Sequence, residues 1–281
     1  MTAFGLGELP GTDLVAAADV VLSESPLPHL PQLPARGIGS DLIGRTAALL
    51  DIPIDRGPRG WRVGTQHRAV RDQMDRDLDV LESLWAGKLD AVKVQVAGPW
   101  TLAAEIEMRN GHRMITDAGA LRDVTDALTE AIHEHREDVE RRLAPTVLQI
   151  DEPSLDAVMR GSLRGATDAE RIPAYPEPEE RLAGFGEYLL HAPVMVNVPW
   201  QTIDLAALQS TAEKDSFAQL LEHGSRFALA PMQPRAVWNV LDELQTDPAA
   251  SSFDVWARPA ETLLQAAANY RAAAEMEEGL R

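Results

Sequence analysis

Apolar residues along the chain follow two spacings, one typical of strands and one typical of helices. Short apolar or alternating runs predict strands at 3–6, 91–96, 147–150, 194–198 and 227–230. Longer stretches with apolar residues three or four positions apart predict helices at 14–22, 41–50, 66–86, 101–108, 117–143, 177–190, 204–224 and 261–278. Strands that alternate with helices are typical of a parallel sheet wrapped by helices. The pattern therefore predicts an α/β protein.

Two regions interrupt this regular alternation. The Pro-rich segment 26–34 predicts extended chain, either a strand edge or a loop, because proline fixes φ and lacks an N–H donor. A generous count gives about eight strands, the number of a (β/α)8 barrel. The count is weakest in the last third, where 204–224 is helical throughout and contains no convincing strand. We therefore expect a single domain over 1–281 whose barrel is incomplete or irregular in its last third.

The charge balance argues against anionic partners. The chain has 26 Lys+Arg and 44 Asp+Glu, a net charge of −18. Such a surface repels phosphate backbones and anionic lipid, so we expect neither nucleic acid nor a membrane as a partner. With only three lysines, Lys88, Lys93 and Lys214, Schiff-base chemistry has few candidate nucleophiles, and we set that class aside at this stage.

The chain contains no cysteine. A disulfide, a thiolate nucleophile and a cysteine-ligated zinc or iron–sulfur cluster are therefore excluded. Residues 1–10 lack a basic leader with an apolar core, and no run approaches the roughly 18 apolar residues of a membrane span. We expect a cytoplasmic protein.

Candidate chemistry lies where predicted strands end. Asp151 and Glu152 directly follow the run at 147–150, and strand alternation would point them to opposite sides, so that one faces the barrel mouth. The alternative is that this acidic pair only caps a helix. Residues 97–101 form a tight turn before a helix, which could hold an anion or could simply pack.

Two of these segments carry a family resemblance. Residues 96–104, Val-Ala-Gly-Pro-Trp-Thr-Leu-Ala-Ala, resemble the AGPWTL turn of the methionine synthase and uroporphyrinogen decarboxylase superfamily. Residues 149–155, Gln-Ile-Asp-Glu-Pro-Ser-Leu, resemble the QIDEPAL strand end of cobalamin-independent methionine synthases, and residues 5–13 resemble their opening loop. The match covers residues 1 to about 200. It implies a TIM-type barrel related to the C-terminal catalytic domain of these enzymes.

The resemblance also implies roles for single residues. Asp151 matches the aspartate that binds the amino group of homocysteine, whereas Glu8 stands in place of the serine that holds the substrate carboxylate. The full set of expected substrate-binding residues is Asp151, Glu152, Glu8, Trp100 and Gln149. The folate contacts are in doubt, because Ala157 replaces a glutamate and Glu105 lies near the position of the stacking tryptophan.

The family's zinc site does not carry over. Its H-x-C pair is expected at the next strand end, where we align Asn197 and Pro199, and its second cysteine is also absent. We therefore expect no cofactor. Asp, Glu and His could still build a harder site, with His191 the only nearby imidazole, although His191 is also consistent with a helix C-terminal cap. His133 and His135 are two residues apart on one helix and point to different faces.

Three functions stay open, and whether the protein is an enzyme is uncertain. The first is a degenerate methionine synthase-like barrel that binds a small metabolite, possible ligands being an amino acid or a folate-like molecule. The second is a metal-free enzyme similar to uroporphyrinogen decarboxylase. For this, Arg36, Arg45, Arg56, Arg59 and Arg62 are candidates to bind propionates. The third is an active homocysteine methyltransferase with a nonstandard metal site. The oligomeric state stays open.

Overall fold

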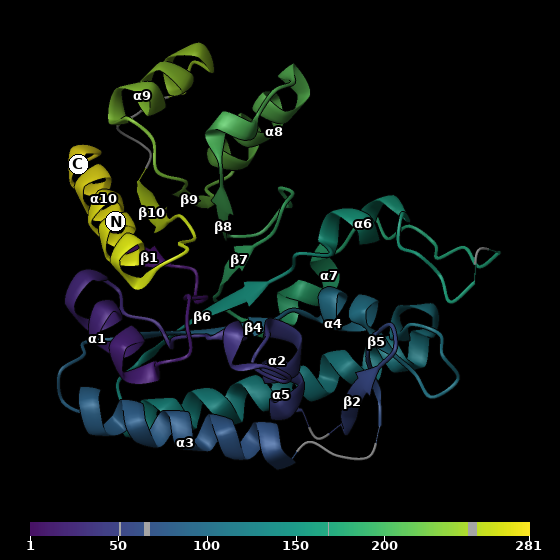
Figure 1. Cartoon of the computed structure of the whole chain (residues 1–281). Coiled ribbons are helices and arrows are strands. Elements are labelled where there is room, and N and C mark those ends of the chain that lie inside the picture. The colour runs from purple at the N-terminus through teal and green to yellow at the C-terminus, as the bar shows by residue number, and fades with distance from the viewer. Residues whose placement is uncertain (51, 65–67, 168, 247–251) are drawn as a thin grey trace.

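The main sheet of the protein is parallel and curled. The computed structural model describes residues 1–50, 52–64, 68–167, 169–246 and 252–281. In these residues seven parallel strands follow the order β1, β10, β9, β8, β7, β6, β4 and curve into a half-barrel (Figure 1). The strands are β1 (Ala3–Gly5), β4 (Val92–Ala97), β6 (Thr146–Asp151), β7 (Leu189–His191), β8 (Trp200–Ile203), β9 (Arg226–Leu229) and β10 (Phe253–Ala257).

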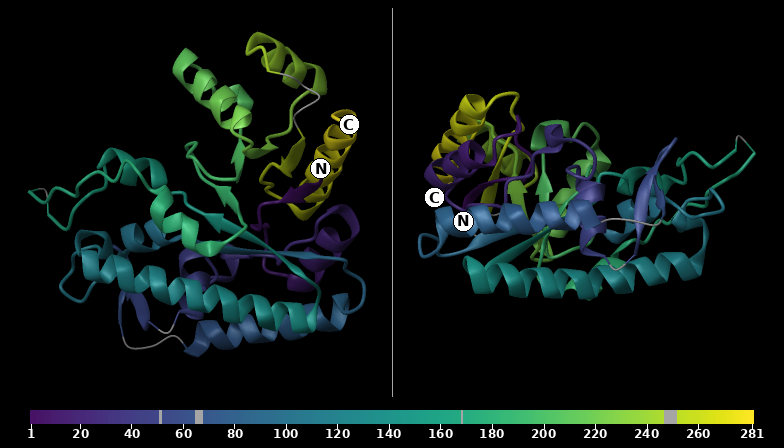
Figure 2. Two further views of the ribbon diagram at one scale, coloured as in Figure 1. Left: turned by 180° about the vertical axis from the view of Figure 1, so that it is seen from behind. Right: turned by 60° about the horizontal axis from the view of Figure 1, so that its bottom comes forward.

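Helices cover the convex side of this sheet (Figure 2). They are α1 (Leu14–Glu24), α2 (Leu42–Leu49), α3 (Arg68–Trp85), α4 (Pro99–Glu105), α5 (Ala118–Arg142), α6 (Leu155–Arg160), α7 (Glu179–Leu182), α8 (Thr211–Glu222), α9 (Pro234–Glu243) and α10 (Leu263–Gly279). Within the described ranges, 3₁₀ turns lie at Pro34–Arg36, Met114–Thr116, Ala183–Phe185 and Leu205–Ala207. α10 contacts α1, and α1 contacts α3, so that the last helix packs beside the first. None of the helices in the described residues is long and apolar enough to cross a membrane.

The two faces of the sheet bury different side chains. In β4, Val92, Val94 and Val96 join the large core beneath the helices, while Lys93 and Gln95 alternate with them onto the concave face. A second, separate apolar cluster fills that concave face. It consists of Phe4, Leu189, Trp200, Ala228, Ala230 and Trp256, with Leu6, Leu27 and Val147 packed against it. The concave side of the curled sheet therefore has an apolar interior that is separate from the large core beneath the helices.

The segment 27–32 lies between the two edge strands of the sheet. Leu27 N–H donates to the Ala3 carbonyl of β1 (3.2 Å), and Leu30 N–H donates to the Lys93 carbonyl of β4 (3.0 Å). Parallel bridges join the segment to β1 at Phe4 and to β4 at Lys93. No continuous ladder forms because prolines at 26, 28, 31 and 34 remove donors at short intervals. The extended chain expected here is thus present, and it bonds on both sides.

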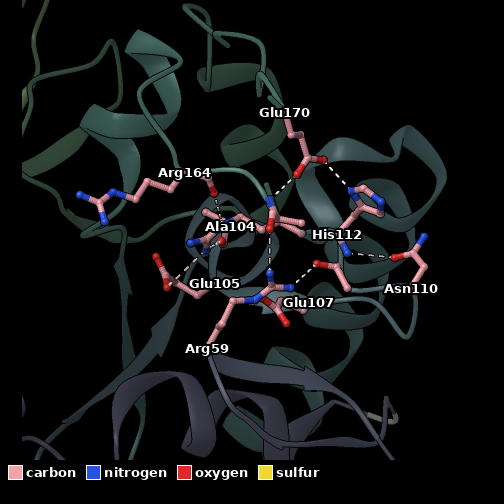
Figure 3. Close-up of polar contacts among 11 residues, drawn as sticks. Arg59, Ala104, Glu105, Glu107, Asn110, His112, Arg164 and Glu170 are labelled. Atoms are coloured by element: carbon pink, nitrogen blue, oxygen red, sulfur yellow. Dashed lines mark hydrogen bonds and ion pairs between the residues drawn. The ribbon is translucent and has the colours of Figure 1, made fainter. Parts of the chain in front are cut away.

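A small three-stranded sheet extends the molecule to one side. It consists of β2 (Ile54–Gly57) and β3 (Gly60–Val63), which are antiparallel, and β5 (Ile106–Glu107), parallel to β3. A group of polar residues, the outer cluster, fastens it to Arg164, Ala166 and Glu170 (Figure 3). The outer cluster consists of Arg59, Glu107, His112, Arg113 and Glu170. Arg59 Nε bonds Glu107 (2.7 Å) while its other nitrogens reach the carbonyls of Gly111 and Ala166.

The structure corrects three expectations about elements. Residues 177–190 hold only the short helix α7 and a 3₁₀ turn before β7, so the long helix predicted there is wrong. The strand predicted at 194–198 is also wrong, because β7 ends at His191 and β8 begins at Trp200. The irregularity expected in the last third lies instead in the first, at 27–32, since β7, β8, β9 and β10 pair without a break.

Candidate functional site

A cavity opens where strands of the main sheet end, beside α10. Its volume is about 260 Å³. Its polar lining residues come from six separate segments, and they are Glu8, Gln32, Asp151, His191, Arg258 and Tyr270. Its apolar lining residues are Leu6, Leu9, Leu42, Pro153, Ala257, Pro259, Ala260 and Ala266. Ligands of parallel α/β proteins bind at the carboxyl ends of the strands, so this mouth cavity is the candidate site.

Asp151 and Glu8 make one side of the mouth cavity acidic. Asp151 closes β6 and is buried, and its Oδ1 accepts the amide N–H of Gln149 (2.6 Å). Burial raises the pKa of Asp151, and the negative charge of Glu8 adds to this, although Lys93 and Gln149 oppose it. Glu8 lies at the exposed rim, where partial desolvation and nearby Asp41 raise its pKa. Both carboxyl groups would ionise more readily beside a bound cation.

Two histidines near the cavity are neutral hydrogen-bonding groups. His29 is fully buried, and its Nδ1 must donate to the Leu30 carbonyl, so its Nε2 accepts from the Tyr270 hydroxyl (2.8 Å). Burial lowers the pKa of His29 to about 3. His191 ends β7 with its Nδ1 2.8 Å from Thr202 Oγ1, and burial, helped by Lys93, lowers its pKa to about 4. His191 is therefore in a strand, and its interpretation as a helix cap is wrong.

Arg258 supplies the cation of the mouth cavity. It follows β10 and places its Nη2 3.2 Å from Asp204 Oδ2, with its side chain about half exposed. The five early arginines considered for propionates do not line this cavity. Arg36 and Arg45 instead approach Asp77, and Arg59 belongs to the outer cluster.

Beneath the cavity floor lies a layer of buried polar side chains. Lys93 donates from Nζ to Gln149 Oε1, and Gln149 Nε2 donates to Asp151 and to the Leu6 carbonyl (2.8 Å). Gln32 Nε2 donates to the Gln95 carbonyl (3.4 Å), while Gln95 Oε1 is buried with no hydrogen-bond partner among the described residues. Gln149, expected as a substrate ligand, thus lies one layer below the cavity.

Glu152 and Trp100, also expected at the substrate, are not among the residues that line the mouth cavity. The carboxylate of Glu152 accepts the N–H groups of Trp100 (3.0 Å) and Thr101 (2.7 Å), so it caps the start of α4. Gly98 allows this approach, because a Cβ there would lie 2.1 Å from Glu152 Oε1. Trp100 donates its indole N–H to the Pro178 carbonyl (3.1 Å) and packs against Tyr175. Both side chains therefore stabilise the turn that leads from β4 into α4.

Asn197 and Pro199 lie in the loop between β7 and β8. The N–H of Asn197 donates to Glu179 Oε1 (3.2 Å), away from the mouth cavity. The strand end that follows β6 is His191, with Ala192 and Pro193 after it. No group of three His, Asp or Glu side chains suited to a metal ion is found in the part of the chain that the structure describes.

One larger cavity adjoins the mouth cavity, and another lies at the opposite end of the strands. One of about 830 Å³ shares His191 with the mouth cavity and has an apolar lining that includes Met159, Val194, Met195 and Trp256. Another, of about 680 Å³, opens at the amino ends of the strands, near Lys88 and Arg226. In parallel barrels that end serves stability, whereas binding occurs at the carboxyl ends. The adjoining cavity at His191 is therefore the relevant extension of the site.

Comparison of the sequence with protein-family models and with curated proteins finds no match for this chain. The resemblance seen at 96–104 and 149–155 therefore stays a prediction.

Sequence reasoning missed several residues of the site. Arg258 was missed because β10, a five-residue strand interrupted by Asp254, was not identified, and Tyr270 was hidden within an Ala-rich helix. Lys93 had a usable signal: the polar residues 93 and 95 alternate with valines in a strand that is buried on both faces. Polar side chains in such a strand must lie inside the protein, where they need partners.

Proposed function

We propose that this chain is a complete (β/α)8 barrel of the cobalamin-independent methionine synthase type that binds a small amine-bearing metabolite in its mouth cavity. The observation that carries the proposal is the pair of carboxylates, Asp151 at the end of β6 and Glu8 in the segment after β1, which line one small cavity. A ligand of about amino-acid size suits the volume of about 260 Å³.

Closure of the barrel is supported by the segment 27–32. Its hydrogen bonds reach both edges of the seven-stranded sheet, at Ala3 and at Lys93. The seven strands of the main sheet are hydrogen-bonded to one another in one continuous order from β1 to β4. We interpret this segment as the second of eight strands, frayed by its prolines.

Recognition of an amine follows from electrostatics. Asp151 is held beside Lys93 and Gln149 in a buried position, where its negative charge is poorly solvated. An ammonium group in the cavity would restore the favourable environment that burial removes, and a charge-assisted hydrogen bond would form. The ligand should therefore bind more tightly as the pH rises through the pKa of Asp151, whose burial places it above the ordinary value of 3.8.

Arg258 provides a second anchoring point of opposite charge. A carboxylate on the ligand would compete with Asp204 for its guanidinium, at the end of the cavity formed by residues 257–260. A zwitterion that carries both groups would then span from Asp151 to Arg258. This arrangement favours an α-amino acid over a simple amine. The apolar cavity beyond His191 has room for a longer side chain or a flat substituent, as a folate-like ligand would have.

Zinc-assisted thiol chemistry does not fit the residues present. The chain has no cysteine, and the strand end that should carry the H-x-C pair offers His191 but then Pro193, which has no donor atom. The Nδ1 of His191 is also engaged by Thr202. We derive no step through zinc, and we expect elemental analysis of the purified protein to find far less than one zinc per chain.

The proposal can be tested by calorimetry with a panel of amino acids and their decarboxylated amines. We expect Asp151→Asn to weaken binding of every amine at least about thirtyfold, since one member of a buried charged pair is lost. Glu8→Gln should have a smaller effect, because Glu8 lies at the exposed rim. Arg258→Gln should weaken amino acids but leave the decarboxylated amines unchanged.

The matched control is Glu187→Gln, which removes a carboxylate that lines the cavity at the opposite end of the strands. It should leave binding unchanged. If Asp151→Asn and the wild-type protein bind the amines equally, Asp151 has no role in recognition and the proposed function is wrong.

A further inference from the structure

Lys93 occupies an unusual position for a charged side chain. It lies at 0% exposure on the concave face of β4, among the side chains that fill the inside of the curled sheet. The other two lysines differ from it: Lys88 is exposed, and Lys214 pairs with Glu243 at the surface (2.7 Å). Burying an ammonium is unfavourable, so an interior lysine usually has a function or a close carboxylate partner.

Lys93 has no such close partner. Its hydrogen bond goes to the neutral amide oxygen of Gln149, and no ion pair within 4 Å joins it to a carboxylate in the described residues. The groups that act on it electrostatically are Asp151, His29 and His191, and both histidines are neutral. The ring of Phe4 lies 5.4 Å from Nζ. Burial lowers the pKa of Lys93 to about 7 and so favours the free amine, which is the nucleophilic form, although Asp151 and the face of the Phe4 ring both favour the ammonium.

The amine lies one side chain below the mouth cavity. Gln149 bonds Lys93 through its oxygen and bonds Asp151 through its nitrogen, and Asp151 lines the cavity floor together with His191. Gln95 Oε1, on the same strand as Lys93, is buried and has no hydrogen-bond partner in the part of the chain that the structure describes, so this layer has unused hydrogen-bonding capacity. A carbonyl oxygen that enters between Asp151 and His191 offers Nζ the same kind of acceptor that Gln149 now provides.

We propose that Lys93 forms an imine with a small aldehyde or ketone bound in the mouth cavity. The inference rests on the proposed function only in that both place the ligand in this cavity. It reverses the expectation from the sequence, in which the small number of lysines argued against Schiff-base chemistry.

The step balances with the groups at hand. Nζ attacks the carbonyl carbon and forms a C–N bond, and one amine proton passes to the carbonyl oxygen, which gives a carbinolamine. The C–O bond then breaks as the Asp151 carboxyl group gives its proton to the departing hydroxyl, which leaves as water. The nitrogen lone pair forms the C=N bond, and the protonated imine stays beside the Asp151 carboxylate. Burial, which raises the pKa of Asp151, keeps the proton available for this transfer.

The lining of the cavity restricts the carbonyl compound. Its volume of about 260 Å³ suits only small molecules, and Asp151 and Glu8 disfavour an anion close to Lys93. We therefore expect uncharged or ammonium-bearing carbonyl compounds to react faster than 2-oxo acids.

The experiment is reductive trapping on the full, native chain. The protein is incubated with sodium cyanoborohydride and either hydroxyacetone, aminoacetone or pyruvate, and peptide mapping measures the added mass at each of the three lysines. We expect Lys93 to be labelled at least about tenfold faster than Lys88 by the first two compounds, because an ordinary lysine is almost entirely protonated at neutral pH. Pyruvate should react more slowly.

Three controls make the result decisive. In urea the three lysines should be labelled equally, which shows that all three peptides are detected. Lys88→Met should leave the labelling of Lys93 unchanged, and Lys93→Met should abolish the fast label. If the native chain is labelled at Lys88 and Lys214 at least as fast as at Lys93 with all three compounds, the proposal is wrong.

The outcome is separate from that of the proposed function. Amino acids that bind without any trapping at Lys93 would overturn the imine and leave amine recognition intact. Trapping at Lys93 in a protein that binds no amino acid would support the imine and overturn amine recognition.

Discussion

Two groups of polar side chains in this protein have similar composition but opposite surroundings. The inner group consists of His29, Lys93, Gln149, Asp151 and His191, beneath and around the mouth cavity. The outer cluster of Arg59, Glu107, His112, Arg113 and Glu170 lies beside the small sheet, and Figure 3 shows Arg59, Glu107, His112 and Glu170. All of the inner group except His191 are buried, whereas the side chains of Arg59 and His112 are about half exposed.

Burial gives the inner group chemical properties that the outer cluster does not have. Burial lowers the pKa of His29 and Lys93 and raises that of Asp151, so the inner groups favour forms that ordinary surface residues do not adopt at neutral pH. In the outer cluster, a hydrogen bond from His112 lowers the pKa of Glu170, and water screens the ion pairs. The outer cluster orders a loop, and the inner group has altered reactivity.

We expect the largest effect of burial on the free energy of unfolding in a comparison of two helix N-termini, one capped by a buried side chain and one by an exposed side chain. Glu152 accepts two backbone N–H groups of α4 inside the protein, and Asp13 accepts those of Val15 and Ala16 at the exposed start of α1. We expect Glu152→Ala to lower the free energy of unfolding by about 3 kcal/mol or more, since it leaves two buried donors without partners. Asp13→Ala should cost only about 1 kcal/mol. Urea denaturation measures both, and equal losses would contradict the role of burial.

A slightly smaller effect is expected from Gly5→Ala, which adds one methyl group to the inner group. The new Cβ would lie 2.5 Å from the Tyr270 ring and 2.6 Å from His29 Nε2. We expect a loss of about 2–3 kcal/mol from overpacking, and disruption of the His29–Tyr270 hydrogen bond. Gly184→Ala is the control, because a Cβ there meets nothing within 4 Å. A stable Gly5→Ala protein would show that this corner of the cavity is loosely packed.

The features of the fold and the site that the sequence predicted are those set by residues close together in the chain. The strands β4 and β6 and the helix α1 follow from short patterns, and the sequence predicted all three at these places. β7 was missed because its three residues follow a stretch with helical spacing, and the true arrangement is set by pairing with β6. The contact between His29 and Tyr270 joins residues 241 positions apart, and no local pattern in the sequence indicates it.

The neutral state of His29 makes stability depend on pH. Its pKa of about 3 in the folded protein lies below the ordinary value of 6.5, so the unfolded chain takes up the proton first. Its contribution to stability is therefore complete above pH 6.5 and is lost as the pH falls, by about 2 kcal/mol at pH 5. We expect His29→Gln to reduce the slope of unfolding free energy against pH, below pH 6, by about 1.4 kcal/mol per pH unit. Tyr270→Phe, which keeps the imidazole buried, should retain the slope; loss of the slope in that variant would assign it to the hydrogen bond instead.

The smallest effect is expected in the outer cluster, although Arg59 makes more contacts there than most residues of the inner group. Its guanidinium bonds Glu107 and the carbonyls of Gly111 and Ala166, and its side chain is 49% exposed. Water replaces these partners when the side chain is removed, so Arg59→Ala should cost about 1 kcal/mol or less. The loss should shrink further as salt rises from about 0.05 M to about 0.5 M, because the Debye length shortens severalfold. Hydrogen exchange at residues 164–167 should nevertheless accelerate, since Arg59 and Arg113 hold that loop through its carbonyls. A loss above about 2 kcal/mol that does not respond to salt would mean that these contacts behave as buried ones, and exposure would then not separate the two groups.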